Sequence, residues 1–170
     1  MAKFNFLNLD SEVRNFMLDE INLDVERGVF FLSERLNEYG KSVYEDFLIK
    51  SVKEGDEEGF EALLEFPKFF NGTEIKNSKQ SKVPKNASTL ICQSEFNRYY
   101  IRGVCLKAIK DGVKSVEIYR GRQSSFVRPE SELQIGKKLD PRELLEDLRN
   151  SIGKQPKLFP EINSGLTIMI

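Results

Sequence analysis

Apolar side chains recur at helical spacing in three stretches near the start of the chain. The first covers residues 12–26 and is followed by Gly28, a residue type that commonly ends a helix. Residues 41–53 and 56–66 repeat the pattern. The first 66 residues are therefore predicted to be mainly helical. Four acidic side chains are expected on the solvated side of the first helix: Asp19, Glu20, Asp24 and Glu26.

A polar stretch at residues 67–86 interrupts this helical pattern. It contains two prolines, several Asn and Gly residues and five lysines, with little apolar periodicity. A structureless connection of this length is unusual in a compact domain. Three interpretations remain open: a functional loop, a β-hairpin around Asn71-Gly72, or a linker.

Two further helices are predicted in the second half, at residues 87–109 and 141–150. Asp140 precedes the second of these as a capping residue, with proline at the first helical position. Cys92 and Cys105 both lie on the first. Thirteen positions along a straight helix span about 20 Å, whereas a disulfide needs Cα atoms roughly 4.4 to 6.8 Å apart. Both thiols are therefore expected to be reduced.

Strand patterns are few and short. Residues 113–119 and 165–170 are rich in β-branched or alternating apolar residues. Residues 3–9 alternate imperfectly, which fits a short edge strand or an extended arm. Helices followed by a few strands predict an α+β fold, in which a helical acidic N-terminal half packs on a helix-strand-loop-helix-strand half with a small sheet.

The length of 170 residues fits a single domain. Within it we distinguish an acidic helical part (1–66), a lysine-rich loop (67–86) and a basic-to-neutral α+β part (87–170).

Charge is distributed unevenly, although the net charge is only −1. Residues 1–66 carry seven basic and 16 acidic side chains, a net of −9. In contrast, residues 67–128 carry 13 basic and four acidic side chains, a net of +9, and the remainder has a net of −1. This pattern indicates either a basic face for an anionic partner or an acidic half that pairs with a basic half.

Several classes of function are excluded by composition. The chain has no histidine, so Ser-His-Asp and Cys-His catalysis and most zinc sites are ruled out. A metal-dependent nuclease is not excluded but is less favoured, because carboxylates such as Glu117 lack its typical spacing. We predict no catalytic residue, no metal site and no cofactor. Neither a signal-peptide core nor an apolar run of about 18 residues is present. A cytoplasmic or intraparticle protein without a membrane partner is expected.

The first candidate binding residues lie on the long predicted helix. Arg98 and Arg102 are four positions apart and share one face, an arrangement suited to phosphate contact. Tyr99, beside them, could stack on a base. The alternative is that Phe96 and Tyr100 belong to the core and that the neighbouring charges pair on the surface.

A second candidate group follows the predicted strand at residues 113–119. Arginine forks, serine hydroxyls and a glycine are the groups that hold phosphate without a metal, although no standard phosphate loop is matched. The candidate phosphate ligands are Arg120, Arg122, Ser124, Ser125 and Arg128, with Tyr119 as a stacking residue. The alternative is an ordinary solvated loop that pairs with acidic residues.

These features favour a non-enzymatic module that binds nucleic acid or a phosphorylated small molecule through the basic segment 67–128. The first alternative is a structural or assembly subunit of a virion-like or other oligomeric particle, in which charged halves of neighbouring copies pair. Under that alternative the partner is a further copy of this chain. The second alternative is a metal-dependent nuclease or hydrolase.

Overall fold

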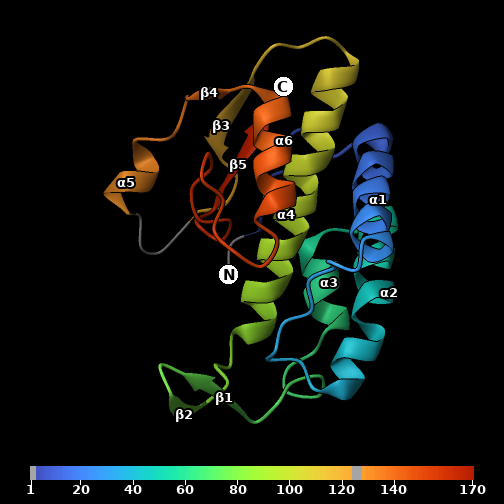
Figure 1. The fold of residues 1–170 in the computed structure, drawn as a ribbon, viewed down its shortest axis with the longest axis vertical. Coiled ribbons are helices and arrows are strands. Elements are labelled where there is room, and N and C mark those ends of the chain that lie inside the picture. The colour runs from blue at the N-terminus through green and yellow to red at the C-terminus, as the bar shows by residue number, and fades with distance from the viewer. Residues whose placement is uncertain (1–2, 124–127) are drawn as a thin grey trace. The chain divides into compact units, whose positions relative to one another are not determined.

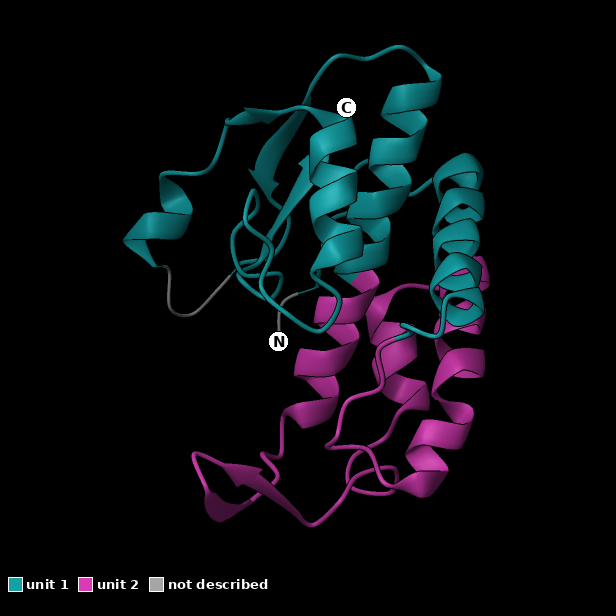
Figure 2. Ribbon diagram, in the orientation of Figure 1, with its two compact units in different colours: residues 1–30, 97–170 teal, residues 31–96 magenta. Residues whose placement is uncertain are grey.

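The computed structural model describes residues 3–123 and 128–170 (Figure 1). Within these ranges it contains six helices and two small antiparallel sheets, of two and three strands. The α+β class is thereby confirmed. The chain forms two compact units, shown in Figure 2. Unit 1 comprises residues 1–30 and 97–170, and unit 2 comprises residues 31–96. These borders differ from those of the charge blocks, and the single domain stays a prediction.

Unit 1 combines three long helical segments with the three-stranded sheet. Its elements are α1 (Ser11–Glu26), the later part of α4 (Ala87–Lys110), β3 (Val116–Arg120), α5 (Pro129–Glu132), β4 (Lys138–Leu139), α6 (Pro141–Asn150) and β5 (Leu166–Met169). Strand β3 is central, with β4 and β5 antiparallel on either side.

Helix α1 follows the predicted pattern closely. The Asp10 carboxylate accepts a hydrogen bond from the backbone N–H of Val13 at 2.8 Å and so caps the first turn. At the other end Gly28 adopts a φ of +68°, which suits glycine. The helix packs tightly on α4, because a Cβ atom added to Gly103 would lie 2.9 Å from Met17 Cγ. Gly103 therefore permits the close approach of the two helices.

The sheet of unit 1 matches the expectation for residues 113–119 and 165–170. Ile118 pairs with Ile168, and both side chains are fully buried. Helix α4 covers β5, since the Tyr100 hydroxyl donates to Ile168 O at 3.2 Å. The N-terminal segment is an extended arm and not an edge strand. Its backbone contact with the sheet is a 2.8 Å hydrogen bond from Asn5 N to Gly121 O.

Helix α6 begins as its sequence predicts. The Asp140 carboxylate accepts from the backbone N–H groups of Arg142 and Glu143, at 2.8 and 3.1 Å. Pro141 occupies the first turn, where its missing N–H costs nothing. The apolar face of the helix is buried through Leu144, Leu145 and Leu148.

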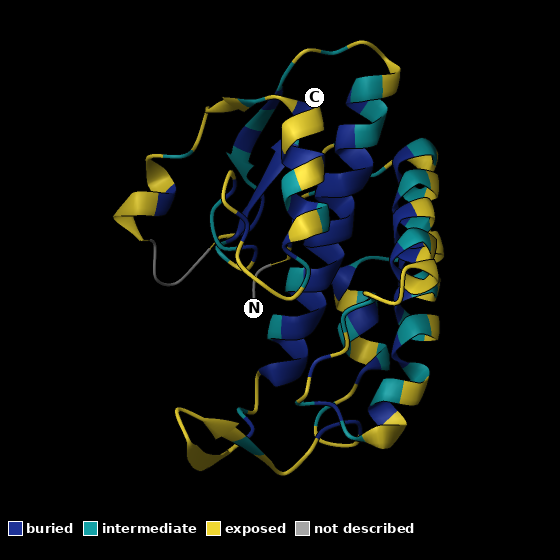
Figure 3. Ribbon diagram, viewed as in Figure 1, coloured by how far each residue is buried: buried dark blue, intermediate teal, exposed yellow. Residues whose placement is uncertain are grey.

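Unit 2 is built from helices and one hairpin. Its elements are α2 (Glu38–Glu54), α3 (Glu57–Leu63), β1 (Thr73–Lys76), β2 (Lys79–Lys82) and the first turns of α4. Helix α2 begins before residue 41, since the Asn37 side chain caps it by accepting from Gly40 N at 2.8 Å. A Cβ atom on Gly40 would lie 2.2 Å from Phe69 O, so only glycine fits there. Buried positions run along α4, while β1 and β2 are exposed (Figure 3).

No helix in the described part of the chain has the length and apolarity needed to cross a membrane.

Both cysteines are free and buried on α4. Burial raises the pKa of the Cys92 and Cys105 thiols. We therefore expect an aromatic disulfide reagent to react with neither thiol in the native protein and with both after unfolding in denaturant. Detection of fewer than two thiols in denaturant would indicate a disulfide and contradict a continuous α4.

Candidate functional site

Arg102, predicted to contact phosphate, lies inside unit 1. Its side chain is 0% exposed. Nε donates to Glu20 at 2.6 Å, while Nη1 and Nη2 donate to the two Asp24 carboxylate oxygens at 2.6 and 2.9 Å. The Tyr99 hydroxyl, also buried, donates to Asp24 at 2.9 Å. Both side chains are buried and engaged inside unit 1, whereas a surface ligand would need to reach solvent; the roles of Arg102 in phosphate binding and of Tyr99 in stacking stay predictions.

This buried network keeps its charges. Burial alone would raise the pKa of Glu20, but hydrogen bonds and charge from Arg149 and Arg102 hold that pKa below its ordinary value. Burial alone would lower the pKa of Arg102. The negative charges and hydrogen bonds of Asp24 and Glu20 have a larger effect than burial, so the pKa of Arg102 lies above its ordinary value. Glu20 and Asp24 were expected on the solvated side of α1; instead they are 2% exposed, because Arg102 neutralises them. The network is structural.

Arg98 is also used internally. Its Nη1 and Nη2 donate to the backbone carbonyls of Ser151 and Lys154, both at 3.1 Å. The side chain is 4% exposed. Arg98 therefore fixes the chain after α6, and its role in phosphate binding stays a prediction that would require the side chain to leave these acceptors.

Tyr119 ties down the N-terminal segment. Its hydroxyl donates to Asn5 O at 2.7 Å and accepts from Leu7 N at 3.0 Å. Partial burial is the main cause that raises the pKa of this phenol. The hydroxyl thus both donates and accepts a hydrogen bond within unit 1, and Tyr119 holds the N-terminal segment in place. Its stacking on a base stays a prediction.

The three remaining candidate arginines each have an internal acceptor. Arg120 forms an ion pair with Glu132. Arg122, 8% exposed, donates to Asn163 O at 3.0 Å. Arg128 pairs with Glu161 at 2.6 Å, although its side chain is 65% exposed. Their roles as phosphate ligands stay predictions, and each would have to release or share its present partner. Ser124 and Ser125 lie outside the described residues.

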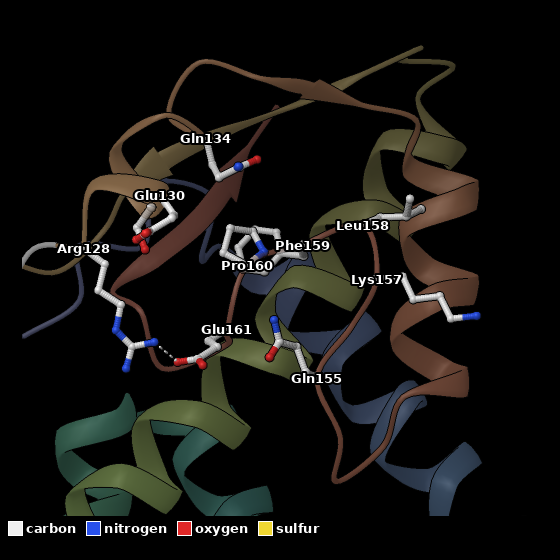
Figure 4. Close-up of a pocket in the computed structure, with 10 residues that line it drawn as sticks. Arg128, Glu130, Gln134, Gln155, Lys157, Leu158, Phe159, Pro160 and Glu161 are labelled. Atoms are coloured by element: carbon white, nitrogen blue, oxygen red, sulfur yellow. Dashed lines mark hydrogen bonds and ion pairs between the residues drawn. The ribbon is translucent and has the colours of Figure 1, made fainter.

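Figure 4 shows the pocket beside Arg128, about 350 Å³ in volume. The guanidinium points toward Glu161, and Glu130 lies on the same wall. Phe159, Pro160 and Lys157 are among the other residues of the lining. Two carboxylates, Glu130 and Glu161, balance the two basic side chains of the lining, Arg128 and Lys157, and leave no surplus of positive charge for an anionic ligand. The pocket therefore gives no support to a phosphate site.

Two lysines of the basic segment are neutralised as well. Lys107 and Lys110 on α4 both form ion pairs with Glu12 on α1. These contacts lower the pKa of Glu12 to about 2. Much of the positive charge in residues 67–128 thus serves the fold.

Four exposed lysines lie close together in the sequence on the hairpin of unit 2 and just beyond it. Strands β1 and β2 are joined by Asn77 and Ser78, whose φ angles of 51° and 61° suit a two-residue hairpin turn. We call residues 73–82, together with Lys85 just beyond, the lysine hairpin. Its four lysines are exposed and have no carboxylate partner in the described structure: Lys76, Lys79, Lys82 and Lys85.

The lysine hairpin is anchored at its root. Arg35 donates from Nε and Nη2 to the two carboxylate oxygens of Glu74, at 2.6 and 3.2 Å. Val83, 5% exposed, packs into unit 2. Because Arg35 neutralises Glu74, the single acidic residue of the hairpin does not offset its lysines.

A β-hairpin is one of the three interpretations left open for residues 67–86, and it is present at residues 73–82. Its turn is at Asn77-Ser78 and not at Asn71-Gly72. Asn71 lies at the root, where its side-chain N–H group donates to the carbonyls of Glu34 and Leu36 at 2.9 and 3.1 Å. These lysines lie in the predicted basic segment, although the sequence analysis does not single them out as site residues. The signal that could have found them is five lysines and one acidic residue within residues 67–86.

No match to this chain is found among protein-family models, curated proteins or solved structures. Within residues 3–123 and 128–170, no three Cys, Asp or Glu side chains gather in a way that could hold a metal ion.

Proposed function

We propose that the protein is a non-enzymatic module that binds nucleic acid through the lysine hairpin. The observation that carries this proposal is the set of four exposed lysines without carboxylate partners on an anchored hairpin. Ammonium groups in such positions neutralise phosphates and release their counterions, which drives binding without sequence readout.

The spacing of the lysines favours a chain of phosphates over one phosphorylated small molecule. Lys76 and Lys79 face each other across the ladder, and Lys82 pairs with Thr73 at the far end of it. At about 3.4 Å per residue, these charges spread over about 10 Å along the hairpin. Convergent side chains around one phosphate would need a concave site, whereas exposed charges spread along a hairpin suit several phosphates of a nucleic-acid backbone.

Replacing the four lysines by glutamine is expected to weaken binding and to flatten its salt dependence. Each phosphate of a duplex that is no longer neutralised removes about 0.9 from the slope of log affinity against log salt, so the slope should fall by about 3 to 4 units. Fluorescence anisotropy with a short labelled duplex, between about 50 and 200 mM salt, measures both quantities.

A matched control removes the same amount of charge elsewhere. Glutamine at four other exposed lysines is expected to change the slope by less than about 1 unit; these are Lys50, Lys53, Lys137 and Lys138. If the two variants weakened binding equally, binding would depend on the total charge of the protein and not on a site at the hairpin. If neither protein bound nucleic acid and the hairpin variant instead changed the oligomer mass in solution, the assembly alternative would replace this proposal.

A further inference from the structure

The two faces of the lysine hairpin differ in chemistry. The register pairs Ile75 with Gln80 and Lys76 with Lys79, so neighbouring pairs point to opposite sides of the ladder. One face, which we call the reading face, carries Thr73, Ile75, Gln80 and Lys82. The other carries Glu74, Lys76, Lys79 and Ser81.

The reading face is turned away from the body of unit 2. Glu74, on the opposite face, is held by Arg35. Ile75 is 82% exposed, more than the other large apolar residues whose exposure the structure describes. Beside it, the Gln80 side-chain amide donates to the Thr73 hydroxyl at 3.2 Å, which leaves the amide carbonyl and one N–H of Gln80 for a ligand.

Shape and residue type point to one kind of nucleic acid. The major groove of B-form DNA, about 12 Å wide, admits a two-stranded β-ribbon, whereas the major groove of duplex RNA is too narrow for side chains to read. The groove floor displays thymine methyl groups and adenine edges, which apolar side chains and Gln contact respectively. Binding of single strands uses aromatic side chains, and residues 73–82 contain none.

We propose that the lysine hairpin enters the major groove of duplex DNA with its reading face toward the bases. Ile75 then contacts thymine methyl groups and Gln80 reaches adenine edges. Lys82, which shares this face, contacts a phosphate that borders the groove, while the long side chains of Lys76 and Lys79 reach phosphates around the edges of the ribbon. This inference rests on the proposed function and adds the form of nucleic acid and the groove.

Removal of the thymine methyl group tests the inference directly. The probes are an alternating A·T duplex and the same duplex with uracil in place of thymine, which differ only in the major groove. Wild-type protein is expected to bind the uracil duplex about fourfold more weakly, the effect of one buried methyl group. Ile75→Ala should bind the thymine duplex about tenfold more weakly and should not distinguish the two duplexes.

Two controls distinguish the contact of Ile75 with the thymine methyl group from a loss of phosphate contacts and from the loss of any exposed apolar side chain. The salt slope of Ile75→Ala should equal that of wild type, because no phosphate contact is lost. Leu133→Ala removes an apolar side chain that is 75% exposed in unit 1, and it should bind both duplexes as wild type does. Duplex RNA of the same sequence should bind more weakly than either DNA.

Equal affinity of the wild type for the two duplexes, or for duplex RNA and duplex DNA, would overturn the inference. If the four-lysine variant still lost its salt slope in that case, the proposed function would stand and only the major-groove contact would fall. Absence of binding to all three probes at low salt would overturn both.

Discussion

Replacement of Arg102 by methionine is expected to destabilise unit 1 by about 3 to 5 kcal/mol, since it leaves buried charges without a partner. Glu20 keeps its pair with Arg149, so the loss falls mainly on Asp24. Asp24 is 2% exposed and would retain the Tyr99 hydroxyl as its hydrogen-bond donor. Urea denaturation followed by circular dichroism measures the difference in the free energy of unfolding.

Two variants define the cause of that loss. Arg102→Met combined with Asp24→Leu removes both charges and should recover most of the stability, because an apolar pair can replace a buried ion pair. Arg128→Gln breaks a pair with Glu161 in which both side chains are exposed, 65% and 42%, and should cost no more than about 1 kcal/mol. If Arg102→Met unfolded at the same urea concentration as wild type, the carboxylates of this network would have access to water and the network would not be buried.

Removal of residues 165–170 is expected to unfold unit 1 or to lower its stability by about 3 to 6 kcal/mol. Leu166 and Ile168 are fully buried, and each contributes about 1.5 to 3 kcal/mol. The deletion also takes away the acceptors of two α4 side chains: Asn97 donates to Leu166 O at 2.9 Å, and Tyr100 donates to Ile168 O. A loss of this size approaches the whole stability of a typical domain. Thermal melting followed by circular dichroism provides the measurement.

Deletion of Ile170 alone is the matched control for this truncation. Its side chain is 41% exposed, contrary to the alternation that would place it inward with Leu166 and Ile168. A shift in melting temperature of only a few degrees is therefore expected. An unchanged melting temperature after loss of all six residues would mean that β5 contributes nothing to the core.

Local signals account for the parts of the fold that the sequence predicts well. Asp10 and Asp140 cap helices through hydrogen bonds to residues two or three positions away. Gly28 ends α1 through its own backbone angle. Such features depend on neighbours in the chain, so a single sequence is enough to recognise them.

Long-range contacts decided what the sequence could not predict. The spacing of Arg98 and Arg102 shows that they share a face, but not that this face is interior. The burial of Arg102 depends on Glu20 and Asp24, 82 and 78 positions away.

The position of the hairpin turn is a second case. The Asn-Gly pair at residues 71–72 is a strong turn signal. Asn71 is instead engaged with carbonyls more than 30 positions earlier, and the turn falls at residues 77–78.

Single substitutions in the exposed lysine hairpin should leave the fold intact. Apart from Glu74, its strand residues 73–82 are exposed and lie outside the core. Exposed substitutions of this kind usually alter the free energy of unfolding by less than about 0.5 kcal/mol. Thr73, Ile75 and Gln80 can therefore be exchanged one at a time while the fold persists. Evolution can thus vary the surface that we propose to bind DNA with little effect on the stability of the rest of the molecule.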